Sequence, residues 1–319
     1  EAGTPTPPSG SGIRGLFPTW TGFGAIGGDG RAYFWNGSQR SAMGRVLDSG
    51  RAIEIAAAQS GSVWRTAEGA VRGPRIDGEL SEPAVHTRLP SGVAQVVAGS
   101  TSFVARMASG EINLWSINRR PSTPYPGVSG AVFATYGRRR NNGEFVAVVR
   151  SDGSVVRIEG GGNGMVAPAP VAGLAGVAKL SAGTDFECVL SATGAVRCFG
   201  GTNSAGQLGD GSTTPRPDPS GAPEILQGVA ELASGLVHTC ARMTNGTVQC
   251  WGSNVVGQLG RTASNMPVTA PVAVPDITGV TAIAANGYTT CVLKDDASVW
   301  CWGSGSLPAP TRMTFSPQS

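Results

Sequence analysis

Six cysteines form the clearest chemical pattern in the chain, because they fall into three pairs, each ten residues apart and centred on a tight turn. The pairs are Cys188 with Cys198, Cys240 with Cys250, and Cys291 with Cys301. Residues equidistant from a hairpin turn lie opposite each other, with Cβ atoms about 4.5–5.5 Å apart, a geometry that permits a disulfide bond. Zinc sites favour cysteines much closer in sequence, so we predict three structural disulfides, no metal site and an oxidising compartment.

Histidines and carboxylates offer few arrangements suited to catalysis. His238 precedes Cys240, and we expect it to make a structural hydrogen bond, because no serine or cysteine nucleophile with an orienting acid is evident. Asp185 and Glu187 flank Phe186, and a hydrolytic carboxylate pair at these positions is an open alternative. No cofactor is expected, since the glycine runs do not follow a strand and open a helix as phosphate-binding loops do.

The composition favours short strands over helices. Among 319 residues, charged residues make up 14% and hydrophobic residues 40%, while 48 glycines and 22 prolines suit tight turns. No long segment has apolar residues at helical spacing, and no apolar run approaches the length required to cross a bilayer. The net charge of +3 is too small to predict a nucleic-acid partner.

A recurring unit positions the cysteine pairs. Its tight turns fall near Asp29-Gly30, Glu68-Gly69, Ser109-Gly110, Asp152-Gly153, Thr193-Gly194, Asn245-Gly246 and Asp296-Ala297. Their spacing is about 40 residues early in the chain and about 50 later, which indicates a propeller or an array. At one fixed distance after the turn stand Trp35, Trp115, Phe199, Trp251 and Trp302. We therefore predict an all-β fold, a seven-bladed β-propeller of four-stranded antiparallel blades.

The units account for nearly the whole chain. Residues 1–12 are rich in proline, glycine and serine and are predicted to be a flexible N-terminal tether. Residues 13–319 are predicted to form one propeller domain. The first unit begins with its inner strand at Ile13 and the last ends with its outer strand after Pro308, so we expect the ring to close by side-chain packing between units one and seven.

Two motifs carry a resemblance to a known family. The sequence GQLG occurs at Gly206 and at Gly257, preceded by Asn203 and Asn254, and HTC is followed by NGTVQCWG in the sixth unit. Between residues 177 and 303 the chain resembles the regulator of chromosome condensation repeat. The resemblance implies a seven-bladed propeller that presents loops to a protein partner.

The resemblance does not extend to every activity in that family. Its nuclear member is a nucleotide exchange factor, but the acidic loop and the protruding wedge on which that activity depends have no match here. The paired cysteines make the secreted bacterial branch, which includes a propeller-type inhibitor of β-lactamases, the nearer analogy.

Loops between first and second strands share one propeller face with loops after third strands. This arrangement predicts a binding rim made of Arg139, Phe186, Leu236, Tyr288, Asn203 and Asn254. Exposed aromatic and arginine side chains are typical of binding surfaces. The alternative is that Phe186 and Tyr288 are buried between blades.

These observations predict a secreted, cell-surface or periplasmic protein that binds a protein partner and catalyses nothing. An inhibitor of an extracellular enzyme is one specific form of this function. We expect a monomer with no membrane span. Two alternatives stay open at this point: a carbohydrate-active enzyme or lectin that works at one face, and a structural surface-display module.

Overall fold

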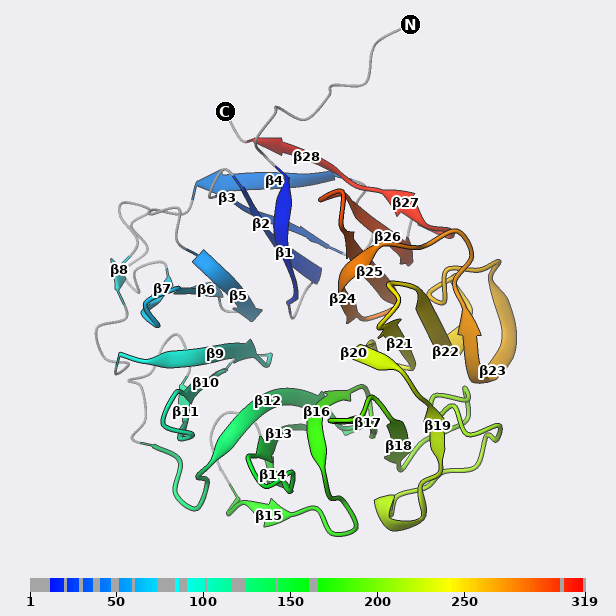
Figure 1. Ribbon diagram of the computed structural model, residues 1–319, viewed down its shortest axis with the longest axis horizontal. Coiled ribbons are helices and arrows are strands. Elements are labelled where there is room, and N and C mark those ends of the chain that lie inside the picture. Colours follow the sequence, from blue (N-terminus) through cyan, green and yellow to red (C-terminus); the bar gives the residue numbers. More distant parts are fainter. Residues whose placement is uncertain are drawn as a thin grey trace, which may run out of the picture.

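The computed structural model confirms an all-β propeller of seven blades arranged around a central axis (Figure 1). It describes residues 12–19, 22–28, 31–36, 41–46, 52–58, 61–73, 84–85, 91–100, 102–115, 124–141, 143–160, 166–304 and 307–317. The predicted tether, apart from Gly12, lies outside the described residues. Within those residues no helix is long and apolar enough to cross a membrane.

The first strand of each blade lies nearest the axis, and the following strands lie progressively farther out (Figure 1). Blade 1 contains β1 (Ile13–Pro18), β2 (Gly22–Gly27), β3 (Arg31–Asn36) and β4 (Ser41–Val46). Blade 2 contains β5 (Ala52–Ala58), β6 (Gly61–Thr66), β7 (Val71–Gly73) and β8 (Ala84–Val85). The described strands of blade 3 are β9 (Val93–Ala98), β10 (Phe103–Met107) and β11 (Ile112–Trp115).

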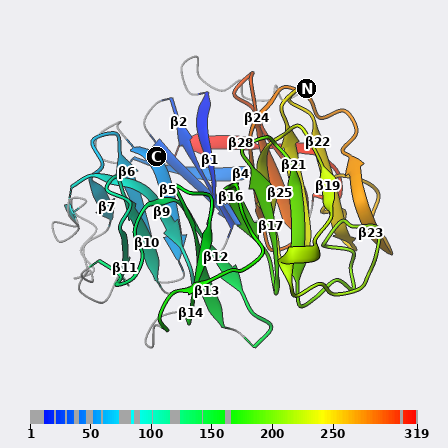
Figure 2. The ribbon, with the colours of Figure 1, turned by 60° about the horizontal axis from the view of Figure 1, so that its bottom comes forward.

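The remaining four blades have four strands each, and all seven blades pack side by side (Figure 2). Blade 4 contains β12 (Ala131–Arg138), β13 (Glu144–Arg150), β14 (Val155–Glu159) and β15 (Ala169–Pro170). Blade 5 contains β16 (Val177–Ala182), β17 (Phe186–Ser191), β18 (Val196–Gly200) and β19 (Glu224–Leu226), with the short helix η1 (Pro219–Gly221) before β19. Blade 6 contains β20 (Val229–Ser234), β21 (His238–Met243), β22 (Val248–Asn254) and β23 (Ser264–Ala273). Blade 7 contains β24 (Val280–Asn286), β25 (Thr289–Lys294), β26 (Val299–Gly303) and β27 (Thr311–Arg312).

The tight turns connect blades as well as strands. The carbonyl of Gly153, in the turn of blade 4, accepts a hydrogen bond from Val177 N, the first residue of the inner strand of blade 5, at 3.1 Å. A Cβ on Gly153 would lie 2.8 Å from the Cα of Gly176, so no side chain fits there. The same bond joins Gly69 to Val93, Gly110 to Ala131, Gly194 to Val229, Gly246 to Val280, and Ala297 to Ile13. Glycine at the turn therefore serves inter-blade packing in addition to turn geometry.

Five of the seven units have an aromatic residue after the turn, whereas Pro74 and Ile158 stand there in blades 2 and 4, and the described aromatic side chains fill the space between blades as the sequence predicts. Trp251 and Trp302 are completely buried, and Trp35 and Phe199 are nearly so. Trp251 packs in a cluster with Leu208 of blade 5. The side chain of Trp115 lies outside the described part of the structure. Burial of these large flat side chains is a main source of stabilisation between the blades that have them.

The three predicted disulfides are present. Cys188 lies directly opposite Cys198 in the pairing of β17 with β18, and the Cα atoms are 4.1 Å apart. The pairs Cys240–Cys250 and Cys291–Cys301 have the same register and Cα separation. Each disulfide therefore connects the second and third strands of one blade.

The expectation about ring closure is wrong. Strand β28 (Thr314–Pro317) leaves blade 7 and pairs in parallel with β4, so it becomes a fifth strand of blade 1 (Figure 1). The ring of Phe315 lies edge-on to Tyr33 and Trp35, with centroid distances of 5.2 and 5.7 Å. Closure thus combines side-chain packing with strand pairing, because the edge of β4 offers unpaired backbone groups that the tail can bind.

Candidate functional site

The loops between first and second strands form one face of the propeller together with the loops between third and fourth strands. We call this the loop face, and the opposite face, which carries the tight turns, the hairpin face. On the loop face, Asp185 N donates to Arg138 O at 2.9 Å, which joins blades 5 and 4. Thr184 N donates to Leu236 O at 2.9 Å, and Leu236 N donates to Gly287 O at 2.8 Å. We call residues 138–140, 183–185, 235–237 and 286–288 the loop belt.

Arginine side chains project from the blade 4 part of the loop belt. Arg139 is partly buried: its guanidinium lies 4.3 Å above the Phe145 ring and forms an ion pair with Glu159. Arg140 is the more accessible of the two, with 66% of its side chain exposed, and its Nε lies 3.8 Å from a carboxylate oxygen of Asp185. Arg139 is therefore held in place, whereas Arg140 is available to a partner.

Exposed apolar side chains also gather on the loop face. Of the six large hydrophobic residues that are exposed within the described residues, four belong to its loops or to strand ends beside them. These are Val166 in blade 4, Val255 and Met266 in blade 6, and Tyr288 in blade 7, with Met266 the most exposed at 73%. Leu236 of the loop belt is partly exposed as well.

Sequence reasoning identified Leu236 and Tyr288 but missed Val166, Val255 and Met266. Val255 directly follows Asn254 of the repeat motif, and Met266 stands in a proline-containing outer strand. Neither position has a pattern that distinguishes an exposed apolar residue from a core residue.

Three of the predicted rim residues lie in the interior. Phe186 is 1% exposed and packs with Leu208 and Trp251, so the alternative of burial between blades holds for Phe186. It does not hold for Tyr288, which is 40% exposed. Asn203 and Asn254 are buried too. In the described conformation only Arg139, Leu236 and Tyr288 of the predicted six can touch a partner.

The buried asparagines hold the loops that follow the third strands of blades 5 and 6. Asn203 Oδ1 accepts from Leu208 N at 3.0 Å, and its Nδ2 donates to Ser212 O at 3.1 Å. Asn254 makes the equivalent bonds: its Oδ1 accepts from Leu259 N at 3.1 Å, and its Nδ2 donates to Thr262 O at 2.7 Å. These side chains satisfy loop backbone groups that would otherwise be buried without partners.

The GQLG motif binds the next blade through a main-chain carbonyl. Trp251 Nε1 donates to Gln207 O at 3.0 Å, and Trp302 Nε1 donates to Gln258 O at 3.0 Å. The motif therefore supplies an acceptor for a buried indole, which explains why motif and tryptophan recur together.

His238 is completely buried between blades 6 and 7. Its Nε2 lies 2.9 Å from Thr290 Oγ1, which itself donates to Gln258 O at 3.1 Å, so Nε2 carries the proton and donates to Thr290. Burial lowers the pKa of His238 to about 3. A neutral imidazole without access to solvent has the structural role that the sequence predicted.

Asp185 and Glu187 lie in an ionic network between blades 4 and 5. Asp185 accepts from Arg140 N at 3.2 Å, and Glu187 is buried and paired with Arg157. Burial raises the pKa of Glu187. Neither carboxylate is among the residues that line the central cavity, so the structure does not bring them together as a pair facing a cleft. Within the described residues, no group of three or more His, Cys, Asp and Glu side chains is placed to hold a metal ion.

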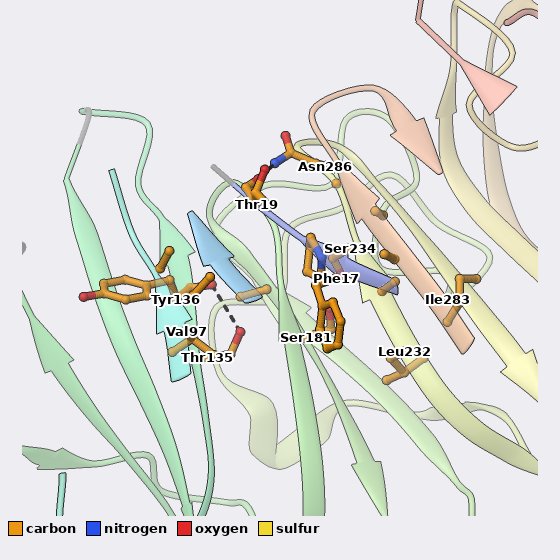
Figure 3. A pocket seen from close by; sticks show the side chains of 18 of the residues that line it. Phe17, Thr19, Val97, Thr135, Tyr136, Ser181, Leu232, Ser234, Ile283 and Asn286 are labelled. Atoms are coloured by element: carbon orange, nitrogen blue, oxygen red, sulfur yellow. Dashed lines mark hydrogen bonds between the residues drawn. The ribbon is translucent and has the colours of Figure 1, made fainter. Parts of the chain in front are cut away.

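The seven inner strands enclose a central cavity of about 390 Å³ (Figure 3). It is lined near its mouth by residues of the loop belt, including Arg138, Leu236 and Asn286. The cavity therefore opens on the loop face.

Comparison with known proteins identifies two of the repeats. The model of the Regulator of chromosome condensation (RCC1) repeat matches residues 229–258 and 280–307, which lie in blades 6 and 7. Human HERC6, a probable E3 ubiquitin-protein ligase, is 36% identical over 128 residues, which are 37% of this chain and 12% of HERC6. The chain thus spans about an eighth of that relative.

Solved structures agree on the fold. RCC1 (Prp20) of yeast, bound to Kap60, superposes with a TM-score of 0.69 at 14% identity, over 86% of this chain and 78% of that one. The ectodomain of the Arabidopsis thaliana receptor kinase ACR4 superposes with a TM-score of 0.52 at 16% identity, over 96% and 100%. The chain is therefore a seven-bladed propeller, and segments of blades 6 and 7 match the RCC1 repeat.

Proposed function

We propose that residues 13–319 form one monomeric, non-enzymatic propeller domain that binds a protein partner through the loop face. The observation that carries this proposal is that the loop face has the exposed apolar residues Val166, Val255, Met266 and Tyr288 together with the accessible Arg140. Exposed apolar patches with aromatic, methionine and arginine side chains are typical of protein interfaces. Hydrogen bonds between the loops of the belt fix the backbone before binding, which reduces the entropic cost of association.

The relatives support a protein partner rather than a particular one. Yeast RCC1 is seen bound to Kap60, and its binding to Gsp1p and histones has been described. Transfer of the general role to this chain rests on the shared propeller and repeats. None of those partners is transferred, because the identity to yeast RCC1 is only 14%.

The three disulfides support a location outside the reducing cytosol, whether secreted, periplasmic or at the cell surface. A propeller of this fold in the ectodomain of ACR4 is compatible with that location. The partner we infer is therefore an extracellular or periplasmic protein. Inhibition of an extracellular enzyme is one specific form of this function.

Affinity capture from the extracellular fraction of the source cells tests the proposal. The double variant Met266→Ser/Tyr288→Ser removes apolar contact area from the loop face, and binding of the captured protein should weaken at least tenfold. The matched control is Ile53→Ser/Val132→Ser, since these residues are also large, exposed and hydrophobic but lie on inner strands near the hairpin face. The control should bind like the parent chain.

Two outcomes contradict the proposal. One is equal binding by the loop-face variant and the parent chain. The other is cleavage of a polysaccharide by the purified chain together with capture of no protein, which would favour the carbohydrate-active alternative.

A further inference from the structure

At the fifth residue of the inner strands, the wall of the central cavity has an apolar half and a half with hydroxyl groups, whereas Thr19, Glu54 and Gln95 add polar groups at other levels of blades 1 to 3. The fifth residue of the inner strand is apolar in blades 1 to 3 and carries a hydroxyl in blades 4 and 5, and blade 6 adds a hydroxyl one residue later. The apolar half contains Phe17, Ala56 and Val97, and the polar half contains Thr135, Ser181 and Ser234. Since blades 4 to 6 are consecutive, the hydroxyls lie on one side of the cavity.

Backbone amides of the inner strands add hydrogen-bond donors to the wall. Each inner strand is the edge of its sheet, so some of its N–H groups point toward the axis. In blades 3, 4 and 7, the backbone amide of the fourth residue of the inner strand donates to a side chain of the preceding blade. The bonds are Val96 N to Glu54 Oε2 at 3.0 Å, Ala134 N to Gln95 Oε1 at 3.0 Å, and Ile283 N to Glu231 Oε2 at 3.2 Å.

The equivalent amides of Leu16 and Ile55 face Ala282 and Gly15 of the preceding blades and have no such acceptor. Neither do those of Leu180 and Leu232. The preceding blades carry Phe133 and Lys179 at the position of the glutamates, and neither side chain can accept a hydrogen bond. Within the described residues, the hydroxyl of Ser181 also makes no hydrogen bond. Blades 5 and 6 therefore present unused donors to the cavity beside an apolar wall.

Charges in the wall are already compensated, and Arg138 at the cavity mouth lies opposite Glu144 in the pairing of β12 with β13 and interacts with it electrostatically. Glu54 pairs with Arg65 at 2.7 Å, and Glu231 pairs with Arg242 at 3.1 Å. A charged ligand would lose hydration without gaining a counter-ion, and an anion would also face two carboxylates.

We propose that the cavity binds a small neutral ring compound that carries an oxygen acceptor along one edge. The ring lies against Phe17 and Val97, and the oxygen accepts from the hydroxyl of Ser181 and from the amides of Leu180 and Leu232. The cavity volume of about 390 Å³ is within the range of small-molecule sites, roughly 300–1,000 Å³. This site adjoins the proposed protein-binding surface on the loop face, and Leu236 belongs to both.

Titration of the purified chain with three probes of one shape tests the inference. 2-Naphthol is neutral with an oxygen acceptor, naphthalene lacks the oxygen, and 2-naphthoate is an anion at pH 7. Fluorescence titration should show one saturable site for 2-naphthol. Naphthalene should bind about fivefold more weakly, and 2-naphthoate at least tenfold more weakly.

Variants locate the site. Ser181→Ala should remove most of the difference between 2-naphthol and naphthalene, whereas Phe17→Ala should weaken both probes alike. Ser204→Ala, at an exposed loop position away from the cavity, is the matched control and should bind as the parent chain does. Ser181→Phe should abolish binding by filling the cavity, and Ala98→Leu, from the apolar side, serves as a second filling variant if the first does not fold.

The inference is overturned if 2-naphthol shows no saturable binding. It is equally overturned if binding persists in a folded filling variant, or if 2-naphthoate binds as tightly as 2-naphthol. Persistence would place the probe outside the cavity, and equal affinity would show that charge compensation in the wall does not select the ligand.

Discussion

Blades 5 to 7 and blades 1 to 4 have the same architecture but are stabilised by different contacts. Blades 5 to 7 contain all three disulfides, and the GQLG loops of blades 5 and 6 accept the indole of the next blade. In blade 3, Val104 and Leu114 occupy the positions of a cysteine pair and are buried. The turn-to-strand hydrogen bond is common to both regions.

This difference shows which contacts every blade needs in order to form and which contacts only some blades have. An apolar pair can replace a disulfide, and a blade can form without the GQLG loop. The tight turn that accepts a hydrogen bond from the next inner strand recurs at six described interfaces, with glycine at five of them and Ala297 at the sixth, and is the shared requirement. The repeat motif therefore belongs to the scaffold, and function is carried by side chains that the motif leaves unspecified.

Among the changes that test this comparison, loss of a disulfide should lower the free energy of unfolding the most. Each hairpin disulfide closes a short loop and contributes about 3 kcal/mol by the chain-entropy model. Urea unfolding of the Cys240→Ala/Cys250→Ala variant should show this loss. Hydrogen exchange in blade 6 should then approach that of blade 3, and unchanged exchange would show that the disulfides do not cause the difference between the regions.

The tail strand connects the two regions, so weakening its packing against blade 1 tests whether the two regions unfold together. Phe315→Ala should cost about 2–3 kcal/mol, because the half-buried ring packs on Tyr33 and Trp35. Met266→Ala, at an exposed position, is the control and should leave thermal unfolding unchanged. Separate unfolding transitions for the two regions in the Phe315 variant would sharpen the comparison, whereas an unchanged melting temperature would contradict the role of the tail.

Acid should destabilise the protein through blade 6. The folded pKa of His238, about 3, lies below its unfolded value of about 6.5, so the unfolded chain binds the proton first. Stability should therefore fall as pH drops from about 6.5 toward about 3, by about 2 kcal/mol at pH 5. His238→Phe, which introduces the residue type of blade 5, should flatten the dependence measured by urea unfolding between pH 7 and pH 5.

The indole hydrogen bond distinguishes tryptophans of the two regions. Trp251→Phe removes a buried donor and leaves Gln207 O without its partner, at a cost of about 1.5 kcal/mol beyond the lost packing. Trp64 Nε1 has no acceptor among the described residues, so Trp64→Phe should lose packing alone. If Trp251→Phe and Trp64→Phe lower the free energy of unfolding by equal amounts, the carbonyl of the GQLG motif does not contribute to stability.

The smallest expected effect is a gain in stability rather than a loss. Ala297 has a φ of 61° at a turn position where other blades have glycine. Ala297→Gly relieves the left-handed strain, roughly 1–2 kcal/mol, but increases the entropy of the unfolded chain by roughly 0.5–1 kcal/mol. Thermal unfolding should show a net gain of about 0.5 kcal/mol, and a lower melting temperature would show that the Cβ of Ala297 stabilises the closing interface.

Much of the fold was predictable because its signals are local. Turn glycines, the aromatic residue five positions later and the spacing of Cys240 and Cys250 recur within each unit, and each reports on a hairpin whose strands are adjacent in sequence. The rim was only partly predictable. The face of a loop follows from strand order, but exposure of a side chain depends on what the neighbouring blade places against it.

Phe186 illustrates the limit of the sequence. It stands in a loop-side position like Tyr288, yet Leu208 and Trp251 cover it, and these lie on a later loop and on the next blade. Met266 shows the reverse, since nothing covers an apolar residue that reads as part of an outer strand.

The sequence by itself determined the number of blades, their strand order and the three disulfides, because all of these depend on periodicity along the chain. Only the tertiary structure decided that Asn203, Asn254 and His238 are interior, that the tail pairs with β4, and that one level of the cavity wall has an apolar half and a half with hydroxyl groups. Each of these depends on contacts between residues far apart in sequence, and burial is set by such contacts.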